Sequence, residues 1–345
     1  MNNVHRSPAW ARAALVGLAG ALVSLVSLAA PATAQASESL TLPGGPTSAT
    51  DPTPVELDAD LYLPPSTPAP AVILAHGFGG SKESVAEQAQ QLADAGFVVL
   101  AYTARGFGES TGLISMNSPQ FEVADASALI DYLGTQSTVS SEGPNDPVVG
   151  VAGGSYGGAL ALLLAAYDDR VDAVAADITW NDLESSLFGQ SMIDAQTPGV
   201  YKQLWTSAFF SAGLDSPQGQ ADLCGRFSPE WCAAYTAAAT TGTVSDDLRA
   251  LMAQSSPASI TDRITVPTLL GGGQADSLFP LQQVNANAEQ IRSANPDTPV
   301  KVVWHGQGHD GGVNESDRLR TLLFYFLISL KKHQLHRQLQ HCHLF

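Results

Sequence analysis

Nearly continuous apolar runs recur along the chain, and each is short enough to form one buried strand. Runs of Val, Ile, Leu and Ala are typical of strands covered on both faces of a parallel sheet. Segments with the apolar spacing of a helix, such as residues 84–96 and 121–134, lie between most of them. The runs occupy residues 71–76, 97–104, 148–155, 171–178, 267–273 and 300–305. We therefore expect an α/β fold with a mostly parallel, doubly wound sheet.

The chain before these runs has a different pattern. Residues 55–64 alternate apolar and polar side chains up to a Pro-Pro turn, which predicts an antiparallel edge strand. Residues 37–54 are rich in Thr, Ser, Pro and Gly without an apolar period, so they are interpreted as a flexible leader or an irregular first strand. The main domain is expected to comprise residues 55–179 and 257–330.

The first 36 residues have the pattern of a secretory signal peptide. Basic residues, among them Arg6 and Arg12, precede an apolar run at 13–30, and small residues suited to cleavage follow it. A membrane anchor is the alternative, but glycines and serines interrupt the run. Because the two arginines are not adjacent, we expect the general secretion route, a secreted extracellular protein, and no stable membrane span after cleavage.

Residues 180–256 are too many for a simple crossover between two strands. They contain aromatic residues and helical stretches of their own, so we expect a mostly helical cap inserted over the strand ends. Cys224 and Cys232 lie close together in this cap. In an exported chain this spacing favours a local disulfide, and two buried thiols are the alternative.

Acidic residues outnumber basic ones by 33 to 16, which gives a formal net charge of -17 at pH 7. This charge argues against nucleic acid and anionic membrane surfaces as partners. Residues 331–345 differ, because they are basic and rich in His and Gln. We interpret them as an atypical tail, in which we expect no metal site.

The glycine-rich stretch after the first apolar run, within residues 71–84, does not fit a nucleotide-binding loop. A P-loop needs a glycine immediately before its lysine and another six positions before it, whereas Lys82 follows a serine and His76 holds the earlier position. A dinucleotide fingerprint that starts at Gly77 ends on Lys82 instead of glycine. We therefore expect no nucleotide and no cofactor.

The apolar run at 148–155 leads into a G-x-S-x-G motif, with Ser155 between Gly153 and Gly157, and then into a helix. This strand-turn-helix setting predicts a nucleophile elbow that exposes the serine hydroxyl above the sheet. The backbone N–H of Tyr156, at the start of the helix, would then donate to the developing oxyanion. The second donor is expected from the glycine-rich loop, at the N–H of Phe78.

An acid and a histidine follow the serine in the order that this motif requires. Asp276 comes just after the apolar run 267–273, and His309 lies in a glycine-rich loop after 300–305. Both follow carboxyl ends of strands, where a doubly wound sheet gathers its functional groups. Ser155, His309 and Asp276 are therefore predicted to be nucleophile, general base and orienting acid. His305 and Asp310 are the alternatives for the histidine and the acid.

Other polar residues have structural interpretations beside functional ones. Asp182 and Glu184 start the cap just past a strand end, so they could bind a substrate ammonium group, although such residues more often cap a helix. Arg105 and Glu109 are expected to form a structural ion pair or loop anchor. His76 is expected to form structural hydrogen bonds in the oxyanion loop.

With these residues the chain resembles the Xaa-Pro dipeptidyl-peptidase-like branch of the α/β-hydrolase superfamily, which includes cocaine-esterase-like and α-amino-acid ester hydrolases. The similarity covers about residues 57–320 and lies in ARGFGESTG, in GGSYGGALALLLAA followed by RVDAVAADITWNDL, and in GHDGG. It implies an α/β-hydrolase fold with a helical cap, and Ser155, Asp276 and His309 as the triad.

Two features depart from that branch. Many members supply an oxyanion donor from a tyrosine side chain, whereas His76, Gly77 and Phe78 stand here, as in ordinary lipases and esterases. Members also usually continue into a carboxyl-terminal β-sandwich, while this chain stops at Phe345, so we expect a truncation or a shifted reading frame.

The sequence thus predicts an exported serine hydrolase that cleaves an ester or a peptide/amide bond of a small molecule through an acyl-enzyme on Ser155. An Xaa-Pro dipeptidyl peptidase and a carboxylesterase acting on small or polyester substrates both stay open. A non-catalytic, truncated surface binding module is the alternative from another class.

Overall fold

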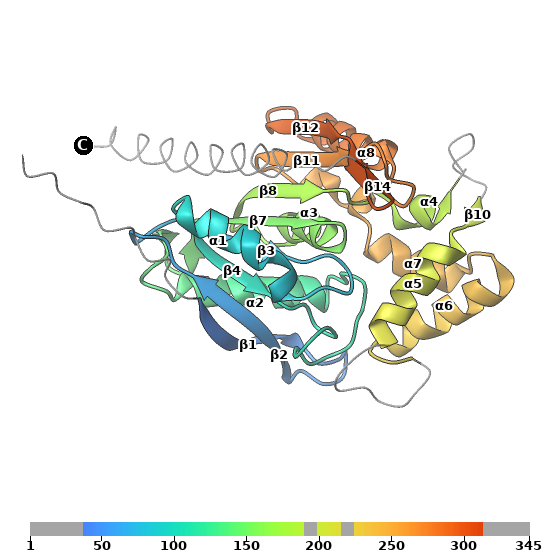
Figure 1. The fold of residues 1–345 in the computed structure, drawn as a ribbon, viewed down its shortest axis with the longest axis horizontal. Helices are drawn as coiled ribbons and strands as arrows, with labels where there is room; N and C mark the ends of the chain where they lie inside the picture. The colour runs from blue at the N-terminus through green and yellow to red at the C-terminus, as the bar shows by residue number, and fades with distance from the viewer. Residues whose placement is uncertain (1–36, 190–198, 215–223, 313–345) are drawn as a thin grey trace, which may run out of the picture. The chain divides into compact units, whose positions relative to one another are not determined.

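The computed structural model describes residues 37–189, 199–214 and 224–312 (Figure 1). Neighbouring strands of its central sheet run parallel except at one end, where the second strand is antiparallel to both of its neighbours. The eight strands, in spatial order, are β1 (Glu38–Pro46), β2 (Pro54–Tyr62), β4 (Val98–Tyr102), β3 (Ala71–Ala75), β7 (Val149–Gly154), β8 (Val171–Asp177), β11 (Thr268–Gly273) and β12 (Val300–His305). The apolar runs form the parallel strands, as the sequence predicts.

Helices cover both faces of the sheet. α1 (Ala86–Asp94) packs on one face, and α2 (Glu122–Gly134), α3 (Tyr156–Tyr167) and α8 (Leu281–Ala294) contribute to the core on the other. α3 is apolar all round and buried along almost its whole length, because it lies between the sheet and its neighbours. This packing fixes the turn before α3, where Ser155 lies. The doubly wound fold is therefore confirmed.

Short elements complete the described part of the chain. They are η1 (Lys82–Val85), β5 (Ser141–Gly143), β6 (Asp146–Pro147), β9 (Phe188–Gly189), β10 (Val200–Tyr201), η2 (Pro257–Ser259), η3 (Thr261–Arg263), β13 (Gln307–Gly308) and β14 (Gly311–Gly312). Within the described ranges no helix has both the length and the apolar character needed to cross a membrane. The predicted signal peptide (1–36) and basic tail (331–345) lie outside the described residues.

Of the two alternatives for residues 37–54, the flexible leader is wrong and the irregular first strand is right, because residues 38–46 form the edge strand β1, whose register shifts between Pro43 and Pro46. Leu40 and Leu42 point to the core, and this short alternation is the signal that the Pro- and Gly-rich composition obscured. β2, predicted as the edge strand, lies instead between β1 and β4. The end of β1 is held by Arg105, which donates to the Pro46 carbonyl at 2.9 Å.

The sequence analysis expected Arg105 and Glu109 to form an ion pair or a loop anchor. The structure shows no ion pair between them. The Arg105 guanidinium binds both carboxylate oxygens of Asp125 on α2, each at 2.6 Å, and both side chains are fully buried. Glu109 is exposed. A bidentate pair is the geometry that lets two buried charges satisfy each other, so the loop after β4 is anchored to α2.

The insertion between β8 and β11 is mostly helical where the structure describes it. Its helices are α4 (Leu183–Leu187), α5 (Gln203–Leu214), α6 (Pro229–Thr241) and α7 (Asp246–Gln254), and Figure 1 shows them grouped beyond the carboxyl end of β8. The two ends of the insertion meet where the buried Trp180 indole N–H donates to the Ser255 carbonyl at 2.7 Å.

Cys224 and Cys232 are joined in a disulfide, with their Cα atoms 5.5 Å apart. The loop that the disulfide closes also binds the main domain. The Ile114 N–H donates to the Arg226 carbonyl at 2.7 Å, and the Ser228 N–H donates to the Ile114 carbonyl at 2.9 Å. The disulfide therefore stabilises a segment that connects the cap to the loop after β4.

Reduction of this disulfide is expected to loosen the cap more than the sheet. Native disulfides typically stabilise a fold by about 2–4 kcal/mol, and this one restrains cap residues only. Limited proteolysis with and without reductant measures the effect, and a Cys224→Ser/Cys232→Ser variant controls for other effects of the reductant. Cleavage within residues 180–256 should become several times faster, while 55–179 stay resistant. Unchanged cleavage of the cap would contradict the prediction.

Candidate active site

Ser155 occupies a strained turn between β7 and α3. Its backbone has φ 55° and ψ -118°, a conformation that non-glycine residues rarely adopt. Two hydrogen bonds hold it there: the Ser155 N–H donates to the Asp177 carbonyl at 2.8 Å, and the Thr179 hydroxyl donates to the Ser155 carbonyl at 2.7 Å. The main chain is thus fixed on both sides while the Ser155 hydroxyl stays directed away from the sheet.

The two glycines of the motif are required by close backbone contacts. A Cβ added to Gly153 would lie 2.5 Å from the carbonyl carbon of Gly157, and one added to Gly157 would lie 2.3 Å from the Ala75 oxygen. Side chains at either position would push α3 away from β3 and β7. The motif is therefore a packing requirement of the turn that presents Ser155.

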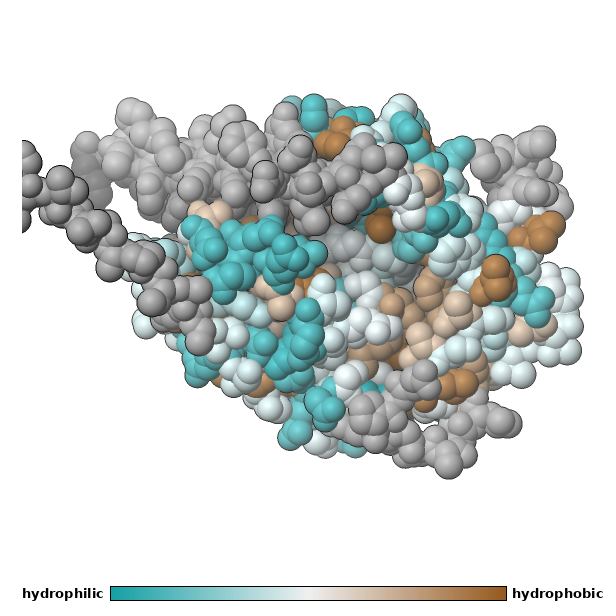
Figure 2. Space-filling view, viewed as in Figure 1, coloured by the Kyte–Doolittle hydropathy of each residue, from teal (hydrophilic) through white to brown (hydrophobic). Residues whose placement is uncertain are grey.

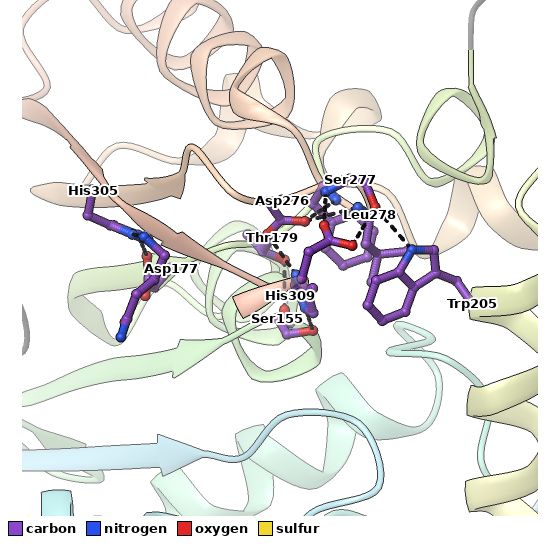
Figure 3. Close-up of polar contacts among 12 residues, drawn as sticks. Ser155, Asp177, Thr179, Trp205, Asp276, Ser277, Leu278, His305 and His309 are labelled. Carbon is purple, nitrogen blue, oxygen red and sulfur yellow. Dashed lines mark hydrogen bonds and ion pairs between the residues drawn. The ribbon is translucent and has the colours of Figure 1, made fainter. Parts of the chain in front are cut away.

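The structure brings the three predicted triad residues together in one hydrogen-bonded chain (Figure 3). His309 Nε2 lies 2.8 Å from Ser155 Oγ, and His309 Nδ1 lies 2.7 Å from Asp276 Oδ2. The other oxygen of Asp276 accepts the N–H groups of Leu278 (3.0 Å) and Phe279 (2.7 Å). These bonds orient the carboxylate toward Nδ1, which favours the tautomer whose Nε2 accepts the serine proton.

Aromatic rings enclose the histidine. The Phe279 ring lies edge-on to the His309 imidazole at 5.2 Å between centroids, and the Trp205 ring does so at 5.9 Å. The Asp276 side chain is fully buried and that of His309 is 12% exposed. Because little water reaches these side chains, the electrostatic interactions between Asp276, His309 and Ser155 are stronger than they would be at the surface.

The two alternative residues have other partners. The Asp310 carboxylate accepts the backbone N–H and the hydroxyl of Ser277, and the N–H bond is the main reason why its pKa is lowered. His305 Nε2 lies 3.0 Å from Asp177 Oδ1, apart from the triad (Figure 3). Neither alternative replaces Asp276 or His309.

The predicted oxyanion donors flank Ser155. Phe78 and Tyr156 both line a small cavity next to Ser155, and their rings pack edge-to-face at 5.5 Å. Tyr156 is the first residue of α3, so its N–H is one of the donors that a helix leaves unpaired. Both residues therefore lie beside Ser155, and their role as oxyanion donors stays a prediction.

His76 holds the loop that carries Phe78. Its Nε2 accepts the Ala104 N–H at 2.9 Å, so its Nδ1–H donates to the Gly77 carbonyl at 2.7 Å. Burial lowers the pKa of His76 to about 4, which keeps the ring neutral at neutral pH. The expected structural role fits these contacts.

The prediction that Asp182 and Glu184 bind substrate is not supported by their contacts. Asp182 is the N-cap of α4 and accepts the Ser185 N–H at 2.6 Å. Glu184 pairs with Arg249 of α7 at 3.1 Å. Neither is among the described residues that line the cavities at Ser155. The spacing that placed them after a strand also places them at a helix start, where an acidic residue is favoured.

The sequence analysis did not identify Lys202 and Trp205, which hold the cap against the loop that carries Asp276. Lys202 Nζ donates to the carbonyls of Ser277 (2.5 Å) and Leu278 (2.9 Å), and burial lowers its pKa. The Trp205 indole N–H donates to the Ser277 hydroxyl at 3.3 Å. The available signal is a single lysine, Lys202, three residues before Trp205 in a mostly apolar segment. This signal does not show that the partners are carbonyl groups far away in the sequence.

Cavities at Ser155 show what the site could accept. One of about 440 Å³ is lined by Ser155, His309, Phe78 and Phe209 among others. Apolar cavities of about 30 and 70 Å³ follow beneath the cap, the first bounded by Ser155, and both lined by Phe78, Met116, Leu187 and Phe209. Figure 2 shows hydrophobic residues gathered over α5, where it faces the sheet.

Comparison with known proteins places this geometry in a family. A model of the X-Pro dipeptidyl-peptidase (S15) family matches residues 53–310. The uncharacterized protein YcjY of Escherichia coli (strain K12) is 35% identical over 134 residues, which cover 37% of this chain and 42% of YcjY. Thiohydrolase aneE of Aspergillus aculeatus is 30% identical over 167 residues, which cover 48% of this chain and 50% of that protein. The chain thus spans half or less of these relatives' lengths.

Solved structures agree on the fold. The Pyrococcus furiosus esterase Pf2001 matches with a TM-score of 0.55 and 17% identity, over 86% of this chain and 91% of that one. At this identity the likeness concerns the fold alone, and it is the α/β-hydrolase fold expected from the sequence. Since the family model covers most of the chain, this protein is an α/β hydrolase that belongs to the X-Pro dipeptidyl-peptidase (S15) family.

Proposed function

We propose that the protein is a serine hydrolase that cleaves carboxylic esters through an acyl-enzyme on Ser155. The observation that carries this proposal is the hydrogen-bonded chain from Asp276 through His309 to Ser155 Oγ, with steps of 2.7 and 2.8 Å. Membership of a hydrolase family supports it.

In the proposed mechanism His309 Nε2 takes the Ser155 proton while Oγ attacks the ester carbonyl. The N–H groups of Phe78 and Tyr156 stabilise the oxyanion, and Asp276 stabilises the imidazolium. His309 then protonates the leaving alcohol as the C–O bond breaks. Water, activated by the same histidine, attacks the acyl-enzyme, and Ser155 regains its proton as the acid is released.

The lining of the cavities favours an uncharged, apolar acyl group. Among the described residues that line them, Asp177 is the only carboxylate, and it is bonded to His305. A dipeptidyl substrate carries an ammonium group, and burying a charge without a partner is costly. We therefore favour a carboxylesterase. The Xaa-Pro dipeptidyl peptidase is the second candidate, which the family match supports.

We also propose export. The signal-peptide pattern of residues 1–36 supports it, as does the disulfide, since such bonds persist in oxidising compartments.

Paired assays test the substrate class. The purified chain is expected to hydrolyse p-nitrophenyl butyrate, with little turnover of Ala-Pro-p-nitroanilide, and Ser155→Ala should lose the activity. Anilide turnover that exceeds ester turnover and is lost in the variant would make the protein a dipeptidyl peptidase. Ligand binding without turnover of either substrate would favour a non-catalytic module.

A further inference from the structure

A buried carboxylate outside the triad lies at the start of α2. Glu122 is 1% exposed and accepts three hydrogen bonds. Its Oε1 accepts the Ser115 N–H at 2.5 Å and the Tyr156 hydroxyl at 3.3 Å, and its Oε2 accepts the Ser118 N–H at 2.9 Å. The mechanism above gives this residue no role, although it contacts the residue that follows the nucleophile.

The bonds of Glu122 enclose a strained turn. Met116 and Asn117 have φ values of 55° and 61°, and two consecutive non-glycine residues in this region cost free energy that other contacts must offset. Glu122 binds the N–H of Ser115 before them and that of Ser118 after them. Its carboxylate is therefore well placed to keep the turn in this conformation.

The strained turn contacts the site through both of its residues, Asn117 and Met116. The Asn117 side-chain amide donates to the Tyr156 carbonyl at 2.8 Å, so Glu122 restrains Tyr156 both directly at its hydroxyl and through Asn117 at its main chain. Met116 lines both apolar cavities beneath the cap. A shift of this turn would move an oxyanion donor and a wall of the acyl site together.

We propose that Glu122, as a carboxylate, is a positioning residue for acyl transfer, which holds the Met116–Asn117 turn and Tyr156 in the arrangement that the reaction needs. The proposal rests on the proposed function of Ser155, and it adds a residue that touches neither the substrate nor the reacting atoms.

Charged and titratable groups from several elements face Glu122. Arg105 comes from the loop after β4, Tyr102 from β4 itself, Asp125 from α2 and Tyr156 from α3. Burial raises the pKa of Glu122 to about 7, although the charge of Arg105 opposes this rise. Both protonation states are therefore populated near neutral pH.

The ionised state suits the observed contacts better. All three partners of Glu122 donate to it, and such hydrogen bonds are stronger to a charged carboxylate than to a neutral acid. As pH falls through about 7, Glu122 gains its proton, and the hydrogen bonds that its carboxylate accepts from the turn weaken. Activity should then fall with the protonation of Glu122.

The acid limb of the pH profile tests this coupling. Log kcat/KM for p-nitrophenyl butyrate should fall by about one unit more between pH 8 and pH 5 in the wild type than in Glu122→Gln, because only the wild type gains a proton at this position. The variant should also be about tenfold slower at pH 8, the effect of one lost hydrogen bond to a charged group. Glu109→Gln, which removes an exposed acid of the same loop, is the matched control and should keep the wild-type pH profile.

Two further measurements do not depend on turnover. Amide exchange at Ser115 and Ser118 should accelerate in Glu122→Gln and be partly restored in Glu122→Asp. Because the folded pKa lies above the ordinary value of 4.5, ionisation costs the wild type stability as pH rises from 5 to 8. The Tm of Glu122→Gln relative to wild type should therefore rise over that range.

The outcomes separate the two proposals. An unchanged acid limb in Glu122→Gln overturns the coupling to catalysis, whatever the exchange rates show. Wild-type protein that turns over no substrate refutes the proposed function, and unchanged exchange at Ser115 and Ser118 then refutes the positioning of the turn as well.

Discussion

Replacement of Ser155 by alanine is expected to lower kcat for ester hydrolysis by a factor of about 10⁶. In the proposed mechanism the Ser155 hydroxyl oxygen forms the bond to the acyl group. His309 Nε2 lies 2.8 Å from this oxygen, and the chain Asp276–His309–Ser155 contains no other hydroxyl that it could deprotonate. The remaining activity would come from the oxyanion donors and substrate binding, which act on an attacking water. Steady-state kinetics on p-nitrophenyl butyrate measure the loss.

Ser141→Ala is the matched control, since this serine is exposed on β5 and its loss should leave kcat within twofold of wild type. The Tm of Ser155→Ala should not fall, because alanine adopts the same turn and the hydroxyl bonds only His309. A variant that keeps a tenth of the activity would mean that another residue is the nucleophile. A fluorophosphonate label that still attaches to the Ser155→Ala protein would mean the same.

The parallel sheet could be predicted because each buried strand needs its own apolar run. Residues 71–75 and 98–102 are apolar at every position, and the structure buries them completely. β1 could be predicted only as an alternative to a flexible leader, because its core contact needs only Leu40 and Leu42, and the pattern is too short to stand out among Pro and Gly. The hydrophobic pattern therefore predicts a strand more clearly when more of its residues are buried.

The three residues of the triad could be predicted because each follows the carboxyl end of a strand. In a parallel sheet these ends lie at the same edge, so their proximity follows from the fold class and no contact between distant residues has to be known. Glu122 and Asp125 had a local signal too, as acids on the stripe of α2 that is otherwise apolar and buried. What the sequence does not give is the partner of each acid. Arg105 and the turn at Met116 belong to a loop whose path depends on tertiary contacts, so the interpretation of Arg105 with Glu109 chose the nearest charge in sequence instead of the nearest in space.

Asp276→Asn should lower kcat by about 10⁴-fold through the tautomer of His309. The N–H groups of Leu278 and Phe279 both donate to Asp276 Oδ1, so an asparagine would keep its oxygen there and turn its NH₂ toward His309 Nδ1. The ring would then have to accept at Nδ1 and carry its proton on Nε2, facing Ser155 Oγ. A protonated Nε2 cannot take the serine proton, so the nucleophile is not activated.

Asp310→Asn separates this effect from a general loss of negative charge near the histidine. Asp310 is bonded to Ser277 and lies next to His309 in sequence, but it does not contact Nδ1. Its substitution should reduce kcat less than tenfold, since it removes hydrogen bonds of the acid loop and leaves the tautomer unchanged. If Asp310→Asn were the more damaging variant, Asp310 would be the orienting acid and the Asp276 contacts would be structural. Because the two substitutions are chemically identical, the ratio of their kcat values measures what the 2.7 Å contact to Nδ1 contributes.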